Sequence, residues 1–111
     1  MRQAVSILSN VACVAATDAN ATSSALGVTI VRCINVTNTA AASGTFSLAL
    51  TAGATSATAA NCDFFTVSVA SNTTQPFYGY WILPASTVVH YQGSAITIHI
   101  TVTGDLSVAG G

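Results

Sequence analysis

Apolar and polar side chains alternate with a period of two along much of the chain, whereas the 3.6-residue period of an amphipathic helix is nearly absent. Residues 96–103 show this most clearly, because Ile96, Ile98, Ile100 and Val102 alternate with threonine and histidine. Such alternation is typical of a strand with one face in a core and the other face polar. The pattern predicts an all-β chain with strands at residues 4–8, 11–17, 27–36, 45–51, 64–69, 77–83, 87–92 and 95–103.

The strands are short and fairly regularly spaced, which predicts an antiparallel β-sandwich of jelly-roll type, and 111 residues suit a single domain. We assign residues 25–104 to the sandwich and residues 105–111 to a C-terminal tail. We expect residues 1–24 to add strands to a sheet or to reach a neighbouring subunit. The predicted core residues are Ile34, Leu48, Ile98 and Ile100.

Two parts of the chain depart from clean alternation. In the strand at residues 27–36, alternation puts the even-numbered residues on one face and the odd-numbered ones on the other. Both sets contain aliphatic side chains, and Arg32 interrupts the even-numbered set, so such a strand can be buried on two sides. Residues 51–61 have neither periodicity nor a bulky side chain, which predicts a long loop, either on the surface or ordered by a neighbour.

Charge is nearly absent. Charged residues make up 5% of the sequence, against about 25% in an ordinary soluble domain, and apolar residues make up 51%. Arg2 and Arg32 are the only strong bases and the formal net charge is −1, so the chain cannot neutralise a run of phosphates or hold an anionic membrane. The most apolar stretch, residues 11–16, is far shorter than the ~20 residues of a membrane-spanning helix. We therefore expect neither nucleic acid nor a membrane as a partner.

The N-terminus resembles a secretory signal peptide, with Arg2 followed by an apolar stretch and a cleavage-like motif at residues 19–21. Ser6, Ser9 and Asn10 interrupt the apolar region, so we expect the segment to be retained. Glycosylation sequons occur at Asn20, Asn35 and Asn72, which would matter in a secreted protein and arise by chance in a chain rich in Asn, Thr and Ser.

The three cysteines, Cys13, Cys33 and Cys62, have neither a C-x-x-C motif nor the spacing of metal ligands. We expect them to be reduced and buried. A disulfide between two of them is the alternative if the chain is secreted.

The two histidines become neighbours if Gly93 and Ser94 form a two-residue hairpin turn. His90 would then pair with Thr97, and His99 would lie diagonally from His90 on the same face. Only two ligands would converge there, and no nearby acid completes a metal site. We therefore expect histidines on a polar face and no metal.

Aromatic residues are concentrated in PFYGYWIL, residues 76–83. Alternation separates Phe77 and Trp81 from Tyr78 and Tyr80, and we expect one of these faces in the core. A sugar-stacking platform would need acidic or amide partners, and this segment supplies only Gln75, so core or interface aromatics are favoured. The candidate interface residues are Val5, Ile7 and Val11 in the N-terminal segment, with Tyr78 and Trp81 here.

Catalysis finds no support in the sequence. The only carboxylate side chains are Asp18, Asp63 and Asp105, each in or beside a predicted turn or strand end, and neither paired carboxylates nor a Ser-His-Asp arrangement is indicated. Cys62 is next to Asp63, but nothing suggests a base for a cysteine nucleophile. We expect no enzyme, no catalytic residue and no cofactor.

The low-charge strands IVRCINVTNT and GTFSLAL, the loop TAGATSATAA and the closing run STVVHYQGSAITIHITVTG resemble the small β-rich virion proteins of tailed bacteriophages. The resemblance covers residues 25–104 and lies in composition and strand rhythm. It implies a structural β-sandwich of the virion, commonly a trimeric capsid-decorating or tail-associated protein. It transfers no functional residue.

We therefore expect a capsid cement or decoration protein that acts as a homotrimer and contacts the major capsid protein or other virion proteins. Surplus apolar and Thr-rich surface would be buried by neighbours in a capsid. Reduced cysteines fit assembly in the bacterial host cytoplasm. The alternatives are a tail, collar or fibre component of the virion, and a secreted β-sandwich such as a pilin-like subunit or a carbohydrate-binding module.

Overall fold

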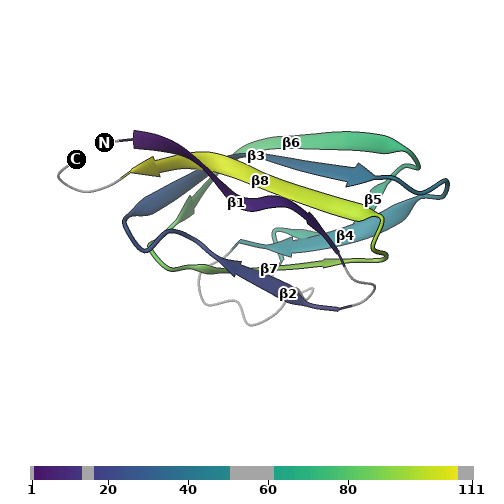
Figure 1. Ribbon diagram of the computed structural model, residues 1–111, viewed down its shortest axis with the longest axis horizontal. Helices are drawn as coiled ribbons and strands as arrows, with labels where there is room; N and C mark the ends of the chain where they lie inside the picture. The colour runs from purple at the N-terminus through teal and green to yellow at the C-terminus, as the bar shows by residue number, and fades with distance from the viewer. Residues whose placement is uncertain (1, 14–16, 51–61, 108–111) are drawn as a thin grey trace.

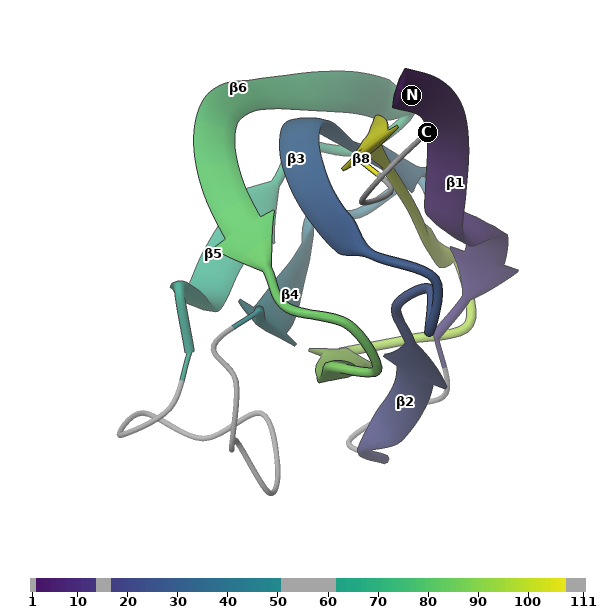
Figure 2. The same cartoon turned by 90° about the vertical axis from the view of Figure 1, so that its left-hand side faces the viewer.

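The chain folds into two facing antiparallel sheets of four strands each (Figures 1 and 2). A computed structural model describes residues 2–13, 17–50 and 62–107. One sheet has the strand order β1-β8-β3-β6 and the other β2-β7-β4-β5. The strands are β1 (Arg2–Ala12), β2 (Ala19–Thr22), β3 (Val28–Asn38), β4 (Gly44–Ala49), β5 (Phe64–Val69), β6 (Thr73–Leu83), β7 (Val88–Gly93) and β8 (Ile98–Ser107).

The pairing is nested: β1 pairs with β8, β2 with β7, β3 with β6 and β4 with β5. A long ribbon of four such strand pairs, wound around a core, is a jelly roll. The predicted all-β antiparallel sandwich is therefore confirmed. Within residues 1–24, β1 forms one edge of the first sheet and β2 forms one edge of the second. At the other end of the chain, β8 continues past Gly104 to Ser107.

Strand boundaries differ from the predictions where side chains are small or a bulge intervenes. The strand predicted at residues 4–8 and the start of the one predicted at residues 11–17 form a single strand, β1, with register shifts between Ser6 and Leu8 and between Leu8 and Val11. This strand ends at Ala12, and residues 14–16 lie outside the described residues. Strand β2, with the sequence ANAT, was not predicted because it lacks the bulky β-branched or aromatic side chains that mark a strand. The loop predicted at residues 51–61 lies outside the described residues.

Strand β3 changes face at a bulge, so the expectation of strict alternation along it is wrong. Its register shifts between Val31 and Cys33 against both β6 and β8. As a result Val31 is in the core before the bulge, and Ile34 is in the core after it. Strand β8 passes close to this point at Gly104, where a Cβ atom would overlap the carbonyl oxygen of Ile30. Only glycine permits this approach, so Gly104 and the bulge depend on each other.

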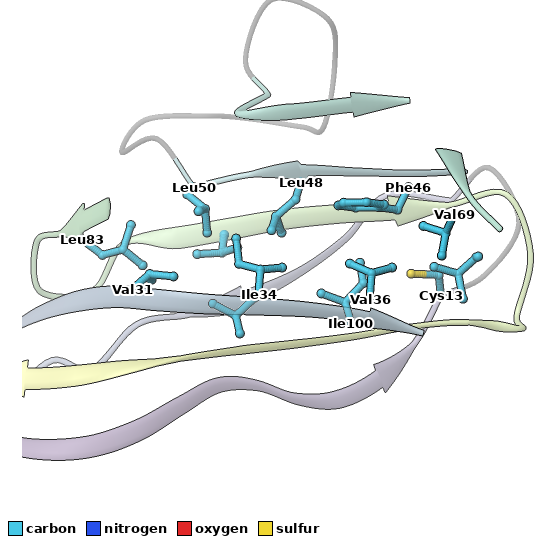
Figure 3. Close-up of a cluster of buried hydrophobic side chains, with 13 residues drawn as sticks. Cys13, Val31, Ile34, Val36, Phe46, Leu48, Leu50, Val69, Leu83 and Ile100 are labelled. Atoms are coloured by element: carbon cyan, nitrogen blue, oxygen red, sulfur yellow. The ribbon is translucent and has the colours of Figure 1, made fainter. Parts of the chain in front are cut away.

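The core lies between the sheets, where aliphatic side chains from both inner faces interdigitate (Figure 3). The largest fully buried side chain is Phe46 on β4. Close packing of this kind makes even the loss of a methylene costly. The four predicted core residues, Ile34, Leu48, Ile98 and Ile100, are each 0% exposed.

An aromatic cluster joins the sheets along the side formed by β5 and β6. Phe46 and Phe64 come from one sheet and Phe77 and Trp81 from the other, with ring centroids 5.2 to 5.8 Å apart in four pairs. Pairs at this separation contribute roughly 0.5–1.5 kcal/mol beyond their burial. The Trp81 ring covers Gly79, where a Cβ atom would overlap it. The inner face of β6 is thus used for packing, and its alternate residues point outward.

Candidate functional site

The outer face of the β1-β8-β3-β6 sheet exposes large side chains of β6. Tyr78, Tyr80 and Ile82 are 79%, 58% and 60% exposed. They point outward because Phe77 and Trp81, the alternate residues, pack inward. We call Tyr78, Tyr80 and Ile82 the aromatic face. The sequence separated these two sets, but it could not show which of them faces outward.

The charges beside the aromatic face neutralise each other. Arg32 Nε donates to Asp105 Oδ2 at 3.3 Å, and the Arg32 guanidinium lies 5.0 Å from the centroid of the Tyr80 ring. Both ion-pair partners are partly exposed, so the pair contributes no more than about 1 kcal/mol to stability. Because the charges of Arg32 and Asp105 are opposite, the ion pair adds no net charge to this surface.

Strand β6 is also an edge strand, since it lies at the end of the sheet order and pairs with β3. An edge of eleven residues is a template for adding a strand from another chain. Pro76 interrupts this edge, because proline has no backbone N–H to donate. Contact through outward side chains is therefore favoured here over continuous strand addition.

The other candidate interface residues occupy different positions. Ile7 and Val11 on β1 are partly buried against the core, and so is Trp81 on the inner face of β6. Val5 lies on β1 opposite Gly104. Of these five, Tyr78 is the one that the described side chains place on an exposed surface.

The predicted hairpin at Gly93 and Ser94 is wrong. Strand β7 ends at Gly93 in one sheet, and β8 begins at Ile98 in the other. The Ser94 side chain does not close a two-residue turn: Ser94 Oγ accepts from the N–H of Thr45 on β4. His90 and His99 thus belong to different sheets, and within residues 2–13, 17–50 and 62–107 no three His, Cys, Asp or Glu side chains form a group that could hold a metal.

His90 has a partner that the sequence did not reveal. Its Nδ1 lies 2.8 Å from Asp18 Oδ2, and the His90 side chain is only 9% exposed. Asp18 precedes β2, whose Asn20 pairs with His90 on β7. The contact joins residues 72 positions apart in sequence through a strand that was not predicted, so no local pattern could have shown it.

An Asp–His pair supports catalysis when a nucleophile lies at the other ring nitrogen. Cys62 is near enough to feel the charge of Asp18, but it is poorly suited to this role. Burial raises the pKa of the Cys62 thiol, and the negative charges of Asp63 and Asp18 raise it further, against a smaller lowering by a hydrogen bond with the Leu48 backbone. These effects favour the thiol over the reactive thiolate. The Asp18–His90 pair fits a structural role, holding the approach to β2 against β7.

All three cysteines are free in the structure. Cys13 is buried, as expected, but Cys33 and Cys62 are only half-buried, so the expectation of burial was wrong for these two. Cys33 follows the bulge of β3 and pairs with outward-facing Tyr78, and Cys62 lies just before β5.

Comparisons of the chain with models of protein families, with curated proteins and with solved structures found no match. In the part of the chain that the structure describes, no helix is long and apolar enough to cross a membrane.

Proposed function

We propose that the protein is a structural component of a tailed-bacteriophage virion, namely a capsid cement protein that acts as a homotrimer. The observation that carries the proposal is the aromatic face, an exposed and nearly neutral surface formed by Tyr78, Tyr80 and Ile82. Exposed apolar side chains gathered on one face mark a surface that associates, and Tyr is enriched at protein interfaces. We assign this face to the contact between subunits.

The fold is compatible with this proposal. Jelly rolls form viral capsid domains, but also lectin and cupin domains, so the fold alone does not determine function. The low charge also supports association between copies, because a chain with 5% charged residues has little electrostatic repulsion to keep free copies apart.

A trimer would strengthen attachment to a shell. One small domain offers one modest footprint, whereas three copies on a rigid body bind with an avidity far above that of any single one. The major capsid protein is the expected partner in this arrangement. A tail, collar or fibre component would use the same aromatic face between its own subunits.

The test is the copy number of the chain in particles purified from its source, measured by quantitative mass spectrometry against the major capsid protein and a tail protein. A cement protein should occur in a fixed ratio to the capsid lattice. A copy number that follows the tail protein would replace the cement role with a tail role. Absence from purified particles would contradict the virion proposal as a whole.

A further inference from the structure

A cleft of about 390 Å³ opens on the outer face of the other sheet, β2-β7-β4-β5. Its volume falls within the range of small-molecule sites, roughly 300–1,000 Å³. Strand β4 forms the floor, while β5 provides one wall and the end of β7 the other. Its lining includes the side chains of Thr45, Ser47, Phe65, Thr66, Gln92 and Ser94.

A bulge in β5 builds the first wall. Phe46 pairs with Val67 but Leu48 pairs with Phe64, so β5 has one residue more than β4 over this stretch. Phe64 packs toward the core, whereas the next residue, Phe65, is 51% exposed and lines the cleft. The bulge therefore presents an aromatic ring beside a small floor residue.

Thr66, the neighbour of Phe65, has a φ angle of 50°. This left-handed conformation is unfavourable for a β-branched residue. The surroundings hold it there, since the Thr66 N–H donates to the Ser47 hydroxyl at 2.9 Å. Backbone strain of this kind is often found where a protein shapes a binding site.

The opposite wall supplies neutral polar groups. Gln92 pairs directly across from Ser47 on the floor of the cleft. Ser94 is fixed at the end of the cleft by two hydrogen bonds with Thr45, one from the Ser94 N–H to the carbonyl and one from the Thr45 N–H to Ser94 Oγ, both 2.9 Å. No charged residue is among those that line the cleft. It thus combines one exposed ring with hydroxyl and amide groups that can both donate and accept.

We propose that this cleft binds a neutral saccharide. A sugar ring has an apolar C–H face that can stack on Phe65, and its hydroxyl groups both donate and accept hydrogen bonds, which matches Gln92, Ser47 and Ser94. An anionic sugar would lose hydration without gaining a counter-charge. The site lies on the sheet opposite the aromatic face, so this inference does not depend on the proposed virion role.

The test is an NMR titration of the intact chain with the methyl glycosides of glucose, galactose, mannose and N-acetylglucosamine, followed on the backbone amides. At least one glycoside should shift amides of β4, β5 and residues 92–94, leaving the outer face of β6 unperturbed. Phe65→Ala should weaken binding about tenfold or more. The matched control is Leu26→Ala, which removes an exposed apolar side chain outside both the cleft and the aromatic face and should leave binding unchanged.

If Phe65→Ala disturbs the fold, Gln92→Ala replaces it in the binding test. This variant removes a hydrogen-bonding group from the opposite wall and should also weaken binding of the glycoside. Three results would overturn the proposal: no amide of the cleft shifts with any of the four glycosides, the cleft variants bind like the Leu26→Ala control, or methyl glucuronide binds as well as the neutral sugars.

Discussion

At the scale of single residues, Cys13 shows how a buried side chain determines what its neighbours can be. Its thiol and Cβ occupy the space where a side chain at Gly93 would lie, and its N–H donates to the Ile98 carbonyl at 2.8 Å. Gly93 therefore ends β7 without a side chain, and the chain crosses from one sheet to the other at this point. Cys13 is 1% exposed, and burial raises the pKa of its thiol to about 11.

This pKa predicts a loss of stability at alkaline pH. Below the ordinary pKa of 9.0 the thiol is protonated in both the folded and the unfolded chain, so it causes no pH dependence. Between pH 9.0 and about 11 the unfolded chain releases the proton while the folded chain keeps it, so the free energy of unfolding falls as pH rises. Urea unfolding at a series of pH values should show this fall, and Cys13→Ala should reduce its slope.

Cys33→Ala is the matched control, because it removes a half-buried thiol from the outer face and should leave that slope nearly unchanged. The raised pKa of Cys62 contributes equally to all three proteins. Burial raises the pKa of Tyr91 in all three, and the further rise that the charge of Cys13 causes is lost only in Cys13→Ala, so it belongs to the same Cys13 effect. Equal slopes for wild type and Cys13→Ala would contradict the assignment to Cys13.

At the scale of elements, the alternation of apolar and polar side chains predicted the strands that contain bulky β-branched or aromatic residues. Strand β5 has the predicted bounds, whereas β2 was missed because ANAT carries no such mark. The bulge at Arg32 could not be predicted, because it depends on Gly104 of a distant strand coming close to Ile30. The Gly93-Ser94 pair looks like a hairpin turn, yet Gly93 packs against Cys13 and Ser94 stays hydrogen-bonded to Thr45 of the same sheet, and the chain then crosses to the other sheet. The cleft and the Asp18–His90 pair likewise depend on pairings between distant segments.

Strand β8 offers a direct test of its inner face. Ile98→Ala should lower the free energy of unfolding by about 2–5 kcal/mol, because it removes a fully buried side chain and leaves a cavity. Ile96→Ala is the matched control, since Ile96 is 68% exposed and precedes the strand, so its replacement should cost about 0.5 kcal/mol or less. Chemical denaturation of both variants measures the difference. Similar losses for the two would contradict the packing described for β8.

At the scale of the whole molecule, the two outer faces differ in chemistry. One sheet carries the aromatic face with a self-compensated Arg32–Asp105 pair, and the other carries an uncharged cleft beside a strained bulge. Neither surface offers a cluster of like charges for steering a partner, so association through either must come from apolar burial and neutral hydrogen bonds.

Association of this chain should therefore be nearly insensitive to salt. We expect homotrimers by light scattering at low salt and again at ~1 M, where the screening length falls to about 3 Å.

Tyr78→Ser combined with Tyr80→Ser should shift the equilibrium toward monomer, because it removes two exposed rings from the aromatic face. Phe65→Ser is the matched control, since it removes an exposed ring from the opposite sheet and should leave the trimer intact. Dissociation by salt alone would mean that ion pairs hold the subunits together, and a monomer under all conditions would remove the trimer from the proposal. If instead Phe65→Ser dissociates the trimer and the tyrosine variant does not, the subunits meet through the second sheet, and the cleft is an interface rather than a sugar site.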